Sequence, residues 1–151
     1  MQRIRLEFPS EAVVHRHSLS VRITDMNYGR HLGHDALISL LHEARAAALD
    51  SLGVKEWDLG GYPSVVADLA VQYQGEARWP DTLIIETALA GAQRKALTVF
   101  HRVVRESDQR LIATARLNLL LVDIETGRPV SIPASVLALL PRANGVSRGD
   151  D

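Results

Sequence analysis

The sequence contains no cysteine, and that absence excludes several kinds of site. The 151-residue chain can have no disulfide framework, no thiolate nucleophile and no cysteine-ligated zinc. Net charge is almost absent too, because 17 basic residues stand against 18 acidic ones. A protein held on nucleic acid mainly by phosphate contacts needs a basic excess. The composition therefore argues against a nucleic-acid partner, while a local basic site for a small phosphorylated ligand remains compatible with it.

Long apolar runs are also absent. None approaches the roughly 20 residues needed to cross a bilayer, and the N-terminal residues 1–16 lack the apolar stretch of a signal peptide. We therefore expect no membrane partner and a cytoplasmic location. Hydrophobic residues make up 46% of the chain, as in a globular protein. The length predicts a single domain over residues 1–151, with its core at about 12–140.

One long helix is predicted from His34 to Leu52. Gly53 fits the position just past its end. A single helix with an apolar stripe must bury that stripe against another element. The stripe consists of apolar residues that recur at spacings of three and four, namely Leu37, Leu40, Leu41, Ala44, Ala48 and Leu52.

Strands are predicted on both sides of this helix. Alternation over residues 12–23 predicts one strand before it, and residues 1–10 are compatible with an edge strand. Short polar connections between the later strands favour an antiparallel meander, and residues 135–140 fit a short terminal helix. The whole pattern predicts an α+β fold in which a curved antiparallel sheet wraps around one long helix. The strands predicted after the helix cover residues 65–73, 82–88, 96–105 and 111–124.

The segment from Val21 to Arg45, VRITDMNYGRHLGHDALISLLHEAR, resembles the 4-hydroxybenzoyl-CoA thioesterase-like family of hotdog proteins. Members show a strand, an aspartate-rich turn, a Gly-His or Gly-Val step and a helix that ends in Glu-x-Ala-Arg. The resemblance covers about residues 18–140. It implies the hotdog fold and an acyl-CoA thioesterase, which hydrolyses a thioester to a carboxylic acid and free CoA. The matching positions are Asp25, His31, Ala44, Arg45, Tyr73, Pro80-Asp81 and 123–133.

The chain departs from the family pattern at one chemically central position. The family's catalytic aspartate is the second Asp of an Asp-x-Asp, and this chain has Asn27 there. A carboxamide cannot act as nucleophile or general base, although it can donate and accept hydrogen bonds. A related hotdog arrangement places Asn or Gln at this position and a carboxylate about two turns into the helix. That location falls on His42, with Glu43 beside it, and Asn27 would then orient the water or the thioester carbonyl.

Two further groups complete the predicted catalytic set. The backbone N–H near His34 opens the helix, where free donors and the positive end of the dipole can stabilise an oxyanion. Asp68 interrupts an apolar strand and requires a partner or a wet cavity, which makes it a third candidate base. His31 and His34 lack a third ligand at suitable spacing, so no metal site is predicted.

CoA enters these expectations as part of the substrate, and no resident cofactor is predicted. By the resemblance, its phosphates bind at Arg94 and Lys95, one as a fork of donors and the other as a point charge. Hotdog subunits generally pair edge to edge, which also hides an exposed edge strand. The resemblance therefore implies a homodimer or a dimer of dimers, with sites at the interface.

Each candidate also has a purely structural interpretation. Glu43 is equally well explained by pairing with a nearby arginine, and His42 by a place on the polar face of the helix. Asp68 suits a strand edge or a dimer contact. Asp25 is best interpreted as a cap that closes its turn through backbone hydrogen bonds.

Two other functions are compatible with the same fold, because one fold hosts several chemistries. A non-catalytic module that binds acyl-CoA or an acyl carrier is favoured by the missing aspartate at position 27. A hotdog dehydratase or hydratase ranks below it, because the His-containing loop and partner acid of those enzymes are not recognisable in the sequence.

Overall fold

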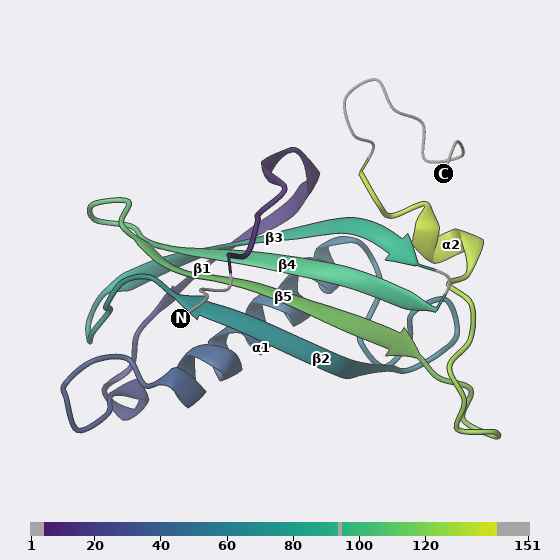
Figure 1. Cartoon of the computed structure of the whole chain (residues 1–151), viewed down its shortest axis with the longest axis horizontal. Helices are drawn as coiled ribbons and strands as arrows, with labels where there is room; N and C mark the ends of the chain where they lie inside the picture. The colour runs from purple at the N-terminus through teal and green to yellow at the C-terminus, as the bar shows by residue number, and fades with distance from the viewer. Residues whose placement is uncertain (1–4, 94, 142–151) are drawn as a thin grey trace.

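The computed structural model describes residues 5–93 and 95–141, which form one antiparallel sheet with a long helix against one face (Figure 1). The predicted curved sheet around a single long helix is confirmed. The strands are β1 (Val13–Ser20), β2 (Ser64–Tyr73), β3 (Thr82–Gln93), β4 (Ala96–Arg105) and β5 (Leu111–Leu121). The helices are α1 (His34–Ser51) and the short α2 (Ala134–Leu137), and two 3-10 turns are η1 (Ser10–Ala12) and η2 (Ile23–Asp25).

The sheet order is β1-β3-β4-β5-β2, so the predicted meander holds only for β3, β4 and β5. It is wrong at β2, which pairs with β5 instead of β3. The eight residues 74–81 between β2 and β3 make this crossing possible. Strand spacings of about 4.8 Å place β3 roughly 14 Å from β2, well within the reach of eight residues. Arg105 fastens the crossing segment, because its guanidinium donates to the carbonyl of Glu76 (2.8 Å).

Three predicted strand boundaries change. The first strand ends at Ser20; the Val21 N–H still bonds Asp81 O in the same register, and the turn η2 follows at Ile23. The strand predicted to end at residue 88 continues to Gln93, and the last one ends at Leu121. Residues 5–9 form no strand, and residues 1–4 lie outside the described part of the chain.

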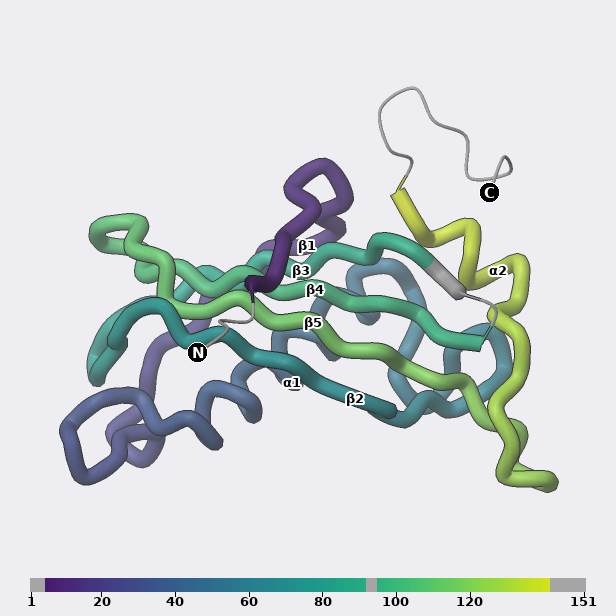
Figure 2. The backbone as a smooth tube through the Cα atoms, viewed as in Figure 1, coloured from purple at the N-terminus to yellow at the C-terminus, as the bar shows by residue number. Residues whose placement is uncertain are grey.

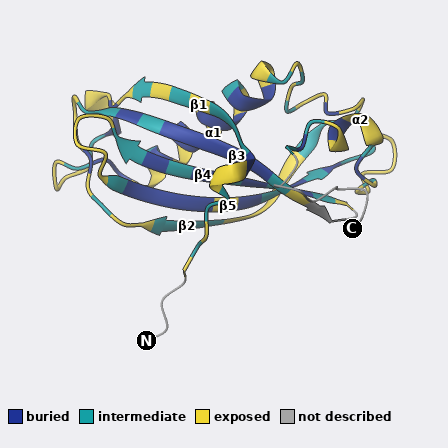
Figure 3. Cartoon of the chain, turned by 90° about the horizontal axis from the view of Figure 1, so that it is seen from above, coloured by how far each residue is buried: buried dark blue, intermediate teal, exposed yellow. Residues whose placement is uncertain are grey.

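Helix α1 matches its prediction within one residue and buries the expected stripe. Leu37, Leu41 and Ala44 are at most 1% exposed. Gly53 has φ +82°, which confirms its place just after the helix. The helix packs mainly over β1 and β3. Figure 3 shows buried residues concentrated on the inner strands, whereas β2 at the edge is intermediate or exposed.

The two ends of the sheet differ in what surrounds them. The N-terminal turn of α1, residues 74–81 and the β4–β5 hairpin meet at one end (Figure 1). The backbone trace in Figure 2 shows the β3–β4 hairpin and α2 at the other end. There Leu59 and Val136 join one apolar cluster with Leu49 of α1. The candidate site lies at the first of these ends.

Candidate functional site

A cavity of about 140 Å³ opens at the N-terminal turn of α1. It adjoins a wider, mainly polar cavity of about 670 Å³, with which it shares His34, Tyr73, Gly75 and Glu76. We refer to these as the narrow and the wide cavity. The narrow cavity is lined by Asn27, His31, Leu32, His34, Leu37, Tyr73, Gly75, Glu76 and Ile112.

Asn27 shapes the loop that leads into α1. Its side-chain oxygen accepts hydrogen bonds from the N–H groups of Gly29 (3.0 Å) and His31 (3.2 Å), which closes a tight Asx-type turn. The backbone repeats the closure, since Asn27 N–H donates to His31 O at 2.8 Å. The side-chain nitrogen of Asn27 has no partner among the described residues. Asn27 is part of the lining of the narrow cavity, and its N–H₂ group is available as a donor.

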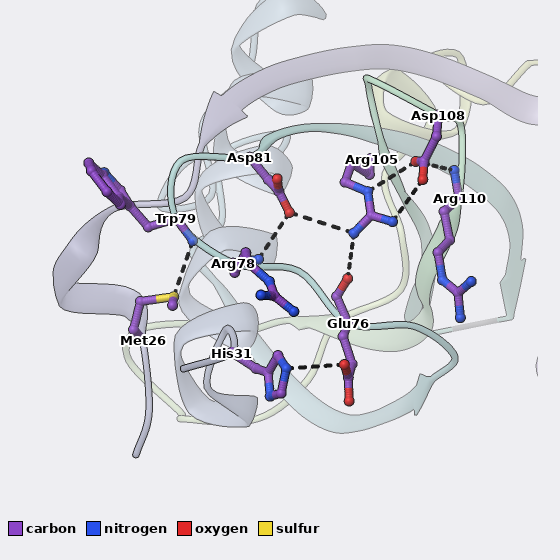
Figure 4. A network of polar contacts seen from close by, with 9 residues as sticks. All are labelled: Met26, His31, Glu76, Arg78, Trp79, Asp81, Arg105, Asp108 and Arg110. Carbon is purple, nitrogen blue, oxygen red and sulfur yellow. Dashed lines mark hydrogen bonds and ion pairs between the residues drawn. The ribbon is translucent and has the colours of Figure 1, made fainter. Parts of the chain in front are cut away.

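His31 and Glu76 form a pair on the cavity wall. His31 Nε2 lies 3.1 Å from a carboxylate oxygen of Glu76 (Figure 4). The Glu76 side chain is 70% exposed, so its carboxylate remains accessible to water and ligand. The backbone on both sides of the pair is fixed, by the Asn27 turn at His31 and by Arg105 at the Glu76 carbonyl.

From the sequence, His31 is a family match and a rejected metal ligand, and no motif singles out Glu76. The two residues are 45 positions apart, and no periodicity connects a loop before α1 with a segment after β2. Only the crossing of residues 74–81 over the sheet end brings them together. Tyr73 was recognised as a family match without a role in the site.

The first turn of α1 supplies backbone donors beside this pair. Gly33 occupies the N-cap position without a side-chain cap, and Leu37 N–H is the first to bond back, to Gly33 O. Among the described residues, nothing accepts from the N–H groups of His34, Asp35 and Ala36. Such free N–H groups at a helix start favour a developing negative charge. The predicted role of the His34 N–H as an oxyanion donor stays a prediction.

Tyr73 holds this turn against β2. Its hydroxyl donates to His34 O (3.1 Å), and the two rings lie 4.5 Å apart between centroids. Burial raises the pKa of Tyr73, and the negative charge of Asp35 adds to the shift. The phenol therefore stays protonated and keeps donating at neutral pH.

Gly75 allows the segment that carries Glu76 to lie close to the backbone of β5. A Cβ at this position would lie 2.5 Å from the backbone carbonyl of Leu111 on β5. Any other residue would push the segment that carries Glu76 away from the sheet, so the position of the His31–Glu76 pair depends on this glycine.

The structure does not bring His42 and Glu43 to either cavity. His42 Nε2 lies 3.2 Å from a carboxylate oxygen of Glu56, and Glu43 lies 2.7 Å from His17 Nε2 on β1. Both side chains are more than half exposed. Glu43 does form a pair, as its structural interpretation required, although the partner is a histidine and not an arginine.

Asp68 lies on the face of the sheet that points away from α1. It follows a bulge in β2 and accepts a hydrogen bond from the Asn118 side chain (2.8 Å). Asn118 in turn accepts from the Thr98 hydroxyl (2.7 Å). The flanking residues Leu97 and Val99 point the other way, into the core. Within one chain Asp68 is therefore part of a polar ladder on the outer face, and the narrow cavity is on the opposite side.

The predicted CoA-phosphate residues belong to the β3–β4 hairpin. Arg94 lies outside the described residues, and Lys95 is exposed at the hairpin. Strand register places this hairpin at the end of the sheet away from Leu83 and Arg105, and so away from both cavities.

The predicted cap is confirmed: Asp25 accepts from the backbone N–H of Arg22 (2.8 Å). Hydrogen bonds from the Arg22 side chain lower the pKa of Asp25, so this carboxylate stays charged.

Two further features concern metals and membranes. Among the described residues, no three His, Asp or Glu side chains gather so that they could hold a metal ion. Within the same part of the chain, no helix has the length and hydropathy needed to span a bilayer.

Comparison with known proteins identifies the family. The model of the thioesterase-like superfamily matches residues 21–140. The chain belongs to the thioesterase-like superfamily. It is 25% identical to the L-carnitine dehydrogenase/betainyl-CoA thioesterase of Agrobacterium fabrum strain C58 over 125 residues. These aligned residues make up 82% of this chain and 26% of that protein. This thioesterase-like chain thus spans about a quarter of the length of the curated relatives that it matches.

Solved structures agree with the family assignment. A Pseudomonas aeruginosa protein assigned as a thioesterase is 26% identical, with a TM-score of 0.74 over 83% of this chain and 97% of that one. A Staphylococcus aureus protein solved in complex with CoA has the same TM-score at 15% identity, over 89% and 85% of the two chains. At that identity the likeness bears on the fold alone. The predicted hotdog fold is confirmed.

Proposed function

We propose that the chain is an acyl-CoA thioesterase, which hydrolyses a thioester to a carboxylic acid and free CoA. The observation that carries the proposal is the narrow cavity, whose lining contains both the His31–Glu76 pair and His34, at the start of α1 where N–H groups are free. Hydrolysis needs a group that accepts a proton from water and donors for the charge that develops on the carbonyl oxygen. This cavity has both. Membership of the thioesterase-like superfamily supports the proposal.

In the proposed reaction Glu76 is the base and His31 orients it. The Glu76 carboxylate takes a proton from a water molecule as the water oxygen attacks the thioester carbon. Backbone N–H groups at His34 and the Asn27 amide nitrogen donate to the resulting oxyanion. The carbon–sulfur bond then breaks, and the proton held by Glu76 passes to the departing CoA sulfur. Neither His42 nor Glu43 is needed, which agrees with their absence from the lining of the two cavities described above.

The acyl group in this proposal is small, because the narrow cavity has a volume of only about 140 Å³. Its walls combine one carboxylate with the ring of Tyr73, and both favour a cationic acyl group. Betainyl-CoA, which carries a quaternary ammonium group and appears in the name of the curated relatives, is therefore one substrate to test.

We further propose a homo-oligomer, built on a dimer that pairs through β2. The two edges of the sheet differ: β1 presents His15, Arg16 and His17, whereas β2 exposes Val65 (50%) and Leu69 (37%). Charged and polar side chains protect an edge strand, and apolar ones invite pairing. Dimer and dimer of dimers both remain compatible with this edge. The proposed reaction uses no resident cofactor, and the cytoplasmic location stays a prediction.

Release of free thiol from acyl-CoA tests the function directly. The panel contains short, long and aromatic acyl chains together with betainyl-CoA, and we expect turnover to be fastest with small acyl groups. Saturable binding of CoA esters without turnover on any of them would favour the non-catalytic binding module instead. Addition of water to an enoyl-CoA, without thiol release, would favour a hydratase.

A further inference from the structure

Three arginines line the wide cavity beside the proposed thioester site. Arg78 comes from the segment before β3, Arg105 from the end of β4 and Arg110 from the β4–β5 hairpin. Figure 4 shows all three side chains around the same space, with Glu76 at its border. Among the described residues that line this cavity, Glu76 is the only one with a carboxylate, and it already contacts His31.

The Arg105 side chain is held in place in this wall by several partners. Its guanidinium donates two hydrogen bonds to the Asp108 carboxylate (3.0 and 2.8 Å) and one to Glu76 O, and it lies 3.6 Å from an Asp81 oxygen. Those hydrogen bonds lower the pKa of Asp108 to about 2, so the ion pair persists throughout the neutral range. The charge of Arg105 is thus balanced by carboxylates.

Arg78 and Arg110 differ from Arg105, because among residues 5–93 and 95–141 no carboxylate pairs with either guanidinium. Their backbones are nevertheless held by the same network. Arg78 N–H donates to Asp81 (3.0 Å) and Arg110 N–H donates to Asp108 (3.1 Å). Asp81 and Asp108 therefore hold the backbones of both arginines, while their negative charge is paired with Arg105. Two unbalanced guanidinium groups remain on a wall whose backbone is fixed.

We propose that the wide cavity binds the phosphate groups of the CoA nucleotide through Arg78 and Arg110, with Arg105 as the positioning residue. This inference rests on the proposed function, since it assigns a second part of the same substrate. The forked donors of arginine match phosphate oxygens and can bind them in pairs. The volume of about 670 Å³ and the polar walls suit a nucleotide better than an acyl chain.

The proposal moves the phosphate site to the other end of the sheet from the position predicted at Arg94 and Lys95. In the register of β3 and β4, the Gln93–Ala96 pair lies at one end and the Leu83–Arg105 pair at the other. Strands of this length separate their ends by roughly 30 Å. One chain therefore cannot use both positions for the same phosphate, and substitutions at the two ends can tell them apart.

Calorimetric titration of the full chain with CoA and with 3′-dephospho-CoA tests the proposal without any need for turnover. Arg78→Gln and Arg110→Gln should each weaken CoA binding roughly tenfold, as expected for the loss of one charged hydrogen bond, and the double variant should weaken it further. Arg128→Gln is the matched control, because Arg128 is an exposed arginine on the turn after β5, and it should bind as the original chain does. Unchanged CoA binding in the double variant, or a loss confined to Lys95→Ala, would overturn the assignment.

Steady-state kinetics distinguish the two groups that the arginines could bind, the phosphates of CoA and a carboxylate on the acyl group. With acyl-CoA the arginine variants should raise KM and leave kcat nearly unchanged, whereas with the matching acyl-pantetheine thioester they should have no effect. If they instead impair only a pantetheine thioester whose acyl group carries a carboxylate, the arginines bind the acyl group and the phosphate assignment is wrong. CoA binding that depends on Arg78 and Arg110 without hydrolysis of any thioester would refute the proposed function and retain the phosphate site.

Discussion

Glu76 is the residue on which the proposed chemistry depends most directly. Glu76→Gln keeps the shape and a partner for His31 but removes the proton acceptor. We expect kcat to fall roughly a hundredfold or more, the scale of a lost general base, with little change in KM. Thiol-release kinetics on a small acyl-CoA measure both quantities, and thermal unfolding checks that the variant is folded.

Two other glutamates make this test specific. Glu125→Gln changes an exposed carboxylate on the turn after β5 and should leave kcat unaltered. Glu43→Gln removes the carboxylate that pairs with His17 and should also retain activity. Activity that survives Glu76→Gln and disappears with Glu43→Gln would assign the base to α1 after all.

His101 makes stability depend on pH. Its ring is fully buried, Nδ1 lies 3.0 Å from the Thr87 hydroxyl, and Nε2 has no partner among the described residues. Burial, and to a lesser extent the charge of Arg45, lower the pKa of His101 to about 3. The folded chain therefore keeps this ring neutral, whereas the unfolded chain takes up a proton below about pH 6.5.

The free energy of unfolding should accordingly fall as the pH drops from 6.5 towards 3. Between pH 6.5 and 4.5 this one group contributes a loss of about 2 to 3 kcal/mol. His101→Gln cannot titrate, so its stability should decline less over this interval by that amount. Urea unfolding of both proteins at the two pH values gives the comparison, and equal declines would show that His101 is not responsible.

At the scale of elements, one buried ion pair ties α1 to the loop that follows it. Arg45 Nε lies 3.2 Å from a carboxylate oxygen of Glu56, and the two side chains are only 9% and 17% exposed. Glu56→Ala would leave the Arg45 charge buried without a partner, and we expect a loss of about 3 kcal/mol in urea unfolding. The pair Lys55–Asp50 joins the same two elements at the surface, where water screens the charges, so Asp50→Ala should cost clearly less stability than Glu56→Ala. Similar losses for both variants would refute this account.

The elements also show how far a sequence can predict this fold. Periodicity located α1 because its apolar stripe lies within one element, and Asp25 could be recognised as a cap because its partner is three residues away. The pairing of β2 with β5 depends on tertiary packing that no local pattern records. The same crossing creates the His31–Glu76 pair, which is why counting along the helix led to His42 and Glu43 instead.

At the scale of the whole molecule, α1 covers only part of the sheet face against which it packs, and the part at β2 stays uncovered. It packs mainly over β1 and β3, so Leu69 and Tyr73 of β2 remain 37% and 41% exposed on the helix side. Tyr73 also lines both cavities. A second copy that pairs along β2 would cover these residues and close the cavities from that side. The proposed dimer would therefore complete the site as well as protect the edge.

Leu69→Arg tests this arrangement, because it places a charge in the middle of the proposed interface. Self-association should weaken by about 2 kcal/mol or more, roughly thirtyfold in the dissociation constant. Sedimentation equilibrium over a range of concentrations measures it. Ile124→Arg is the control, since Ile124 is 80% exposed on the turn after β5 and should leave association unchanged. If the dimer completes the site, thiol-release activity of Leu69→Arg should rise with protein concentration in step with the dimer fraction. A fully active monomer would show instead that one chain holds the whole site.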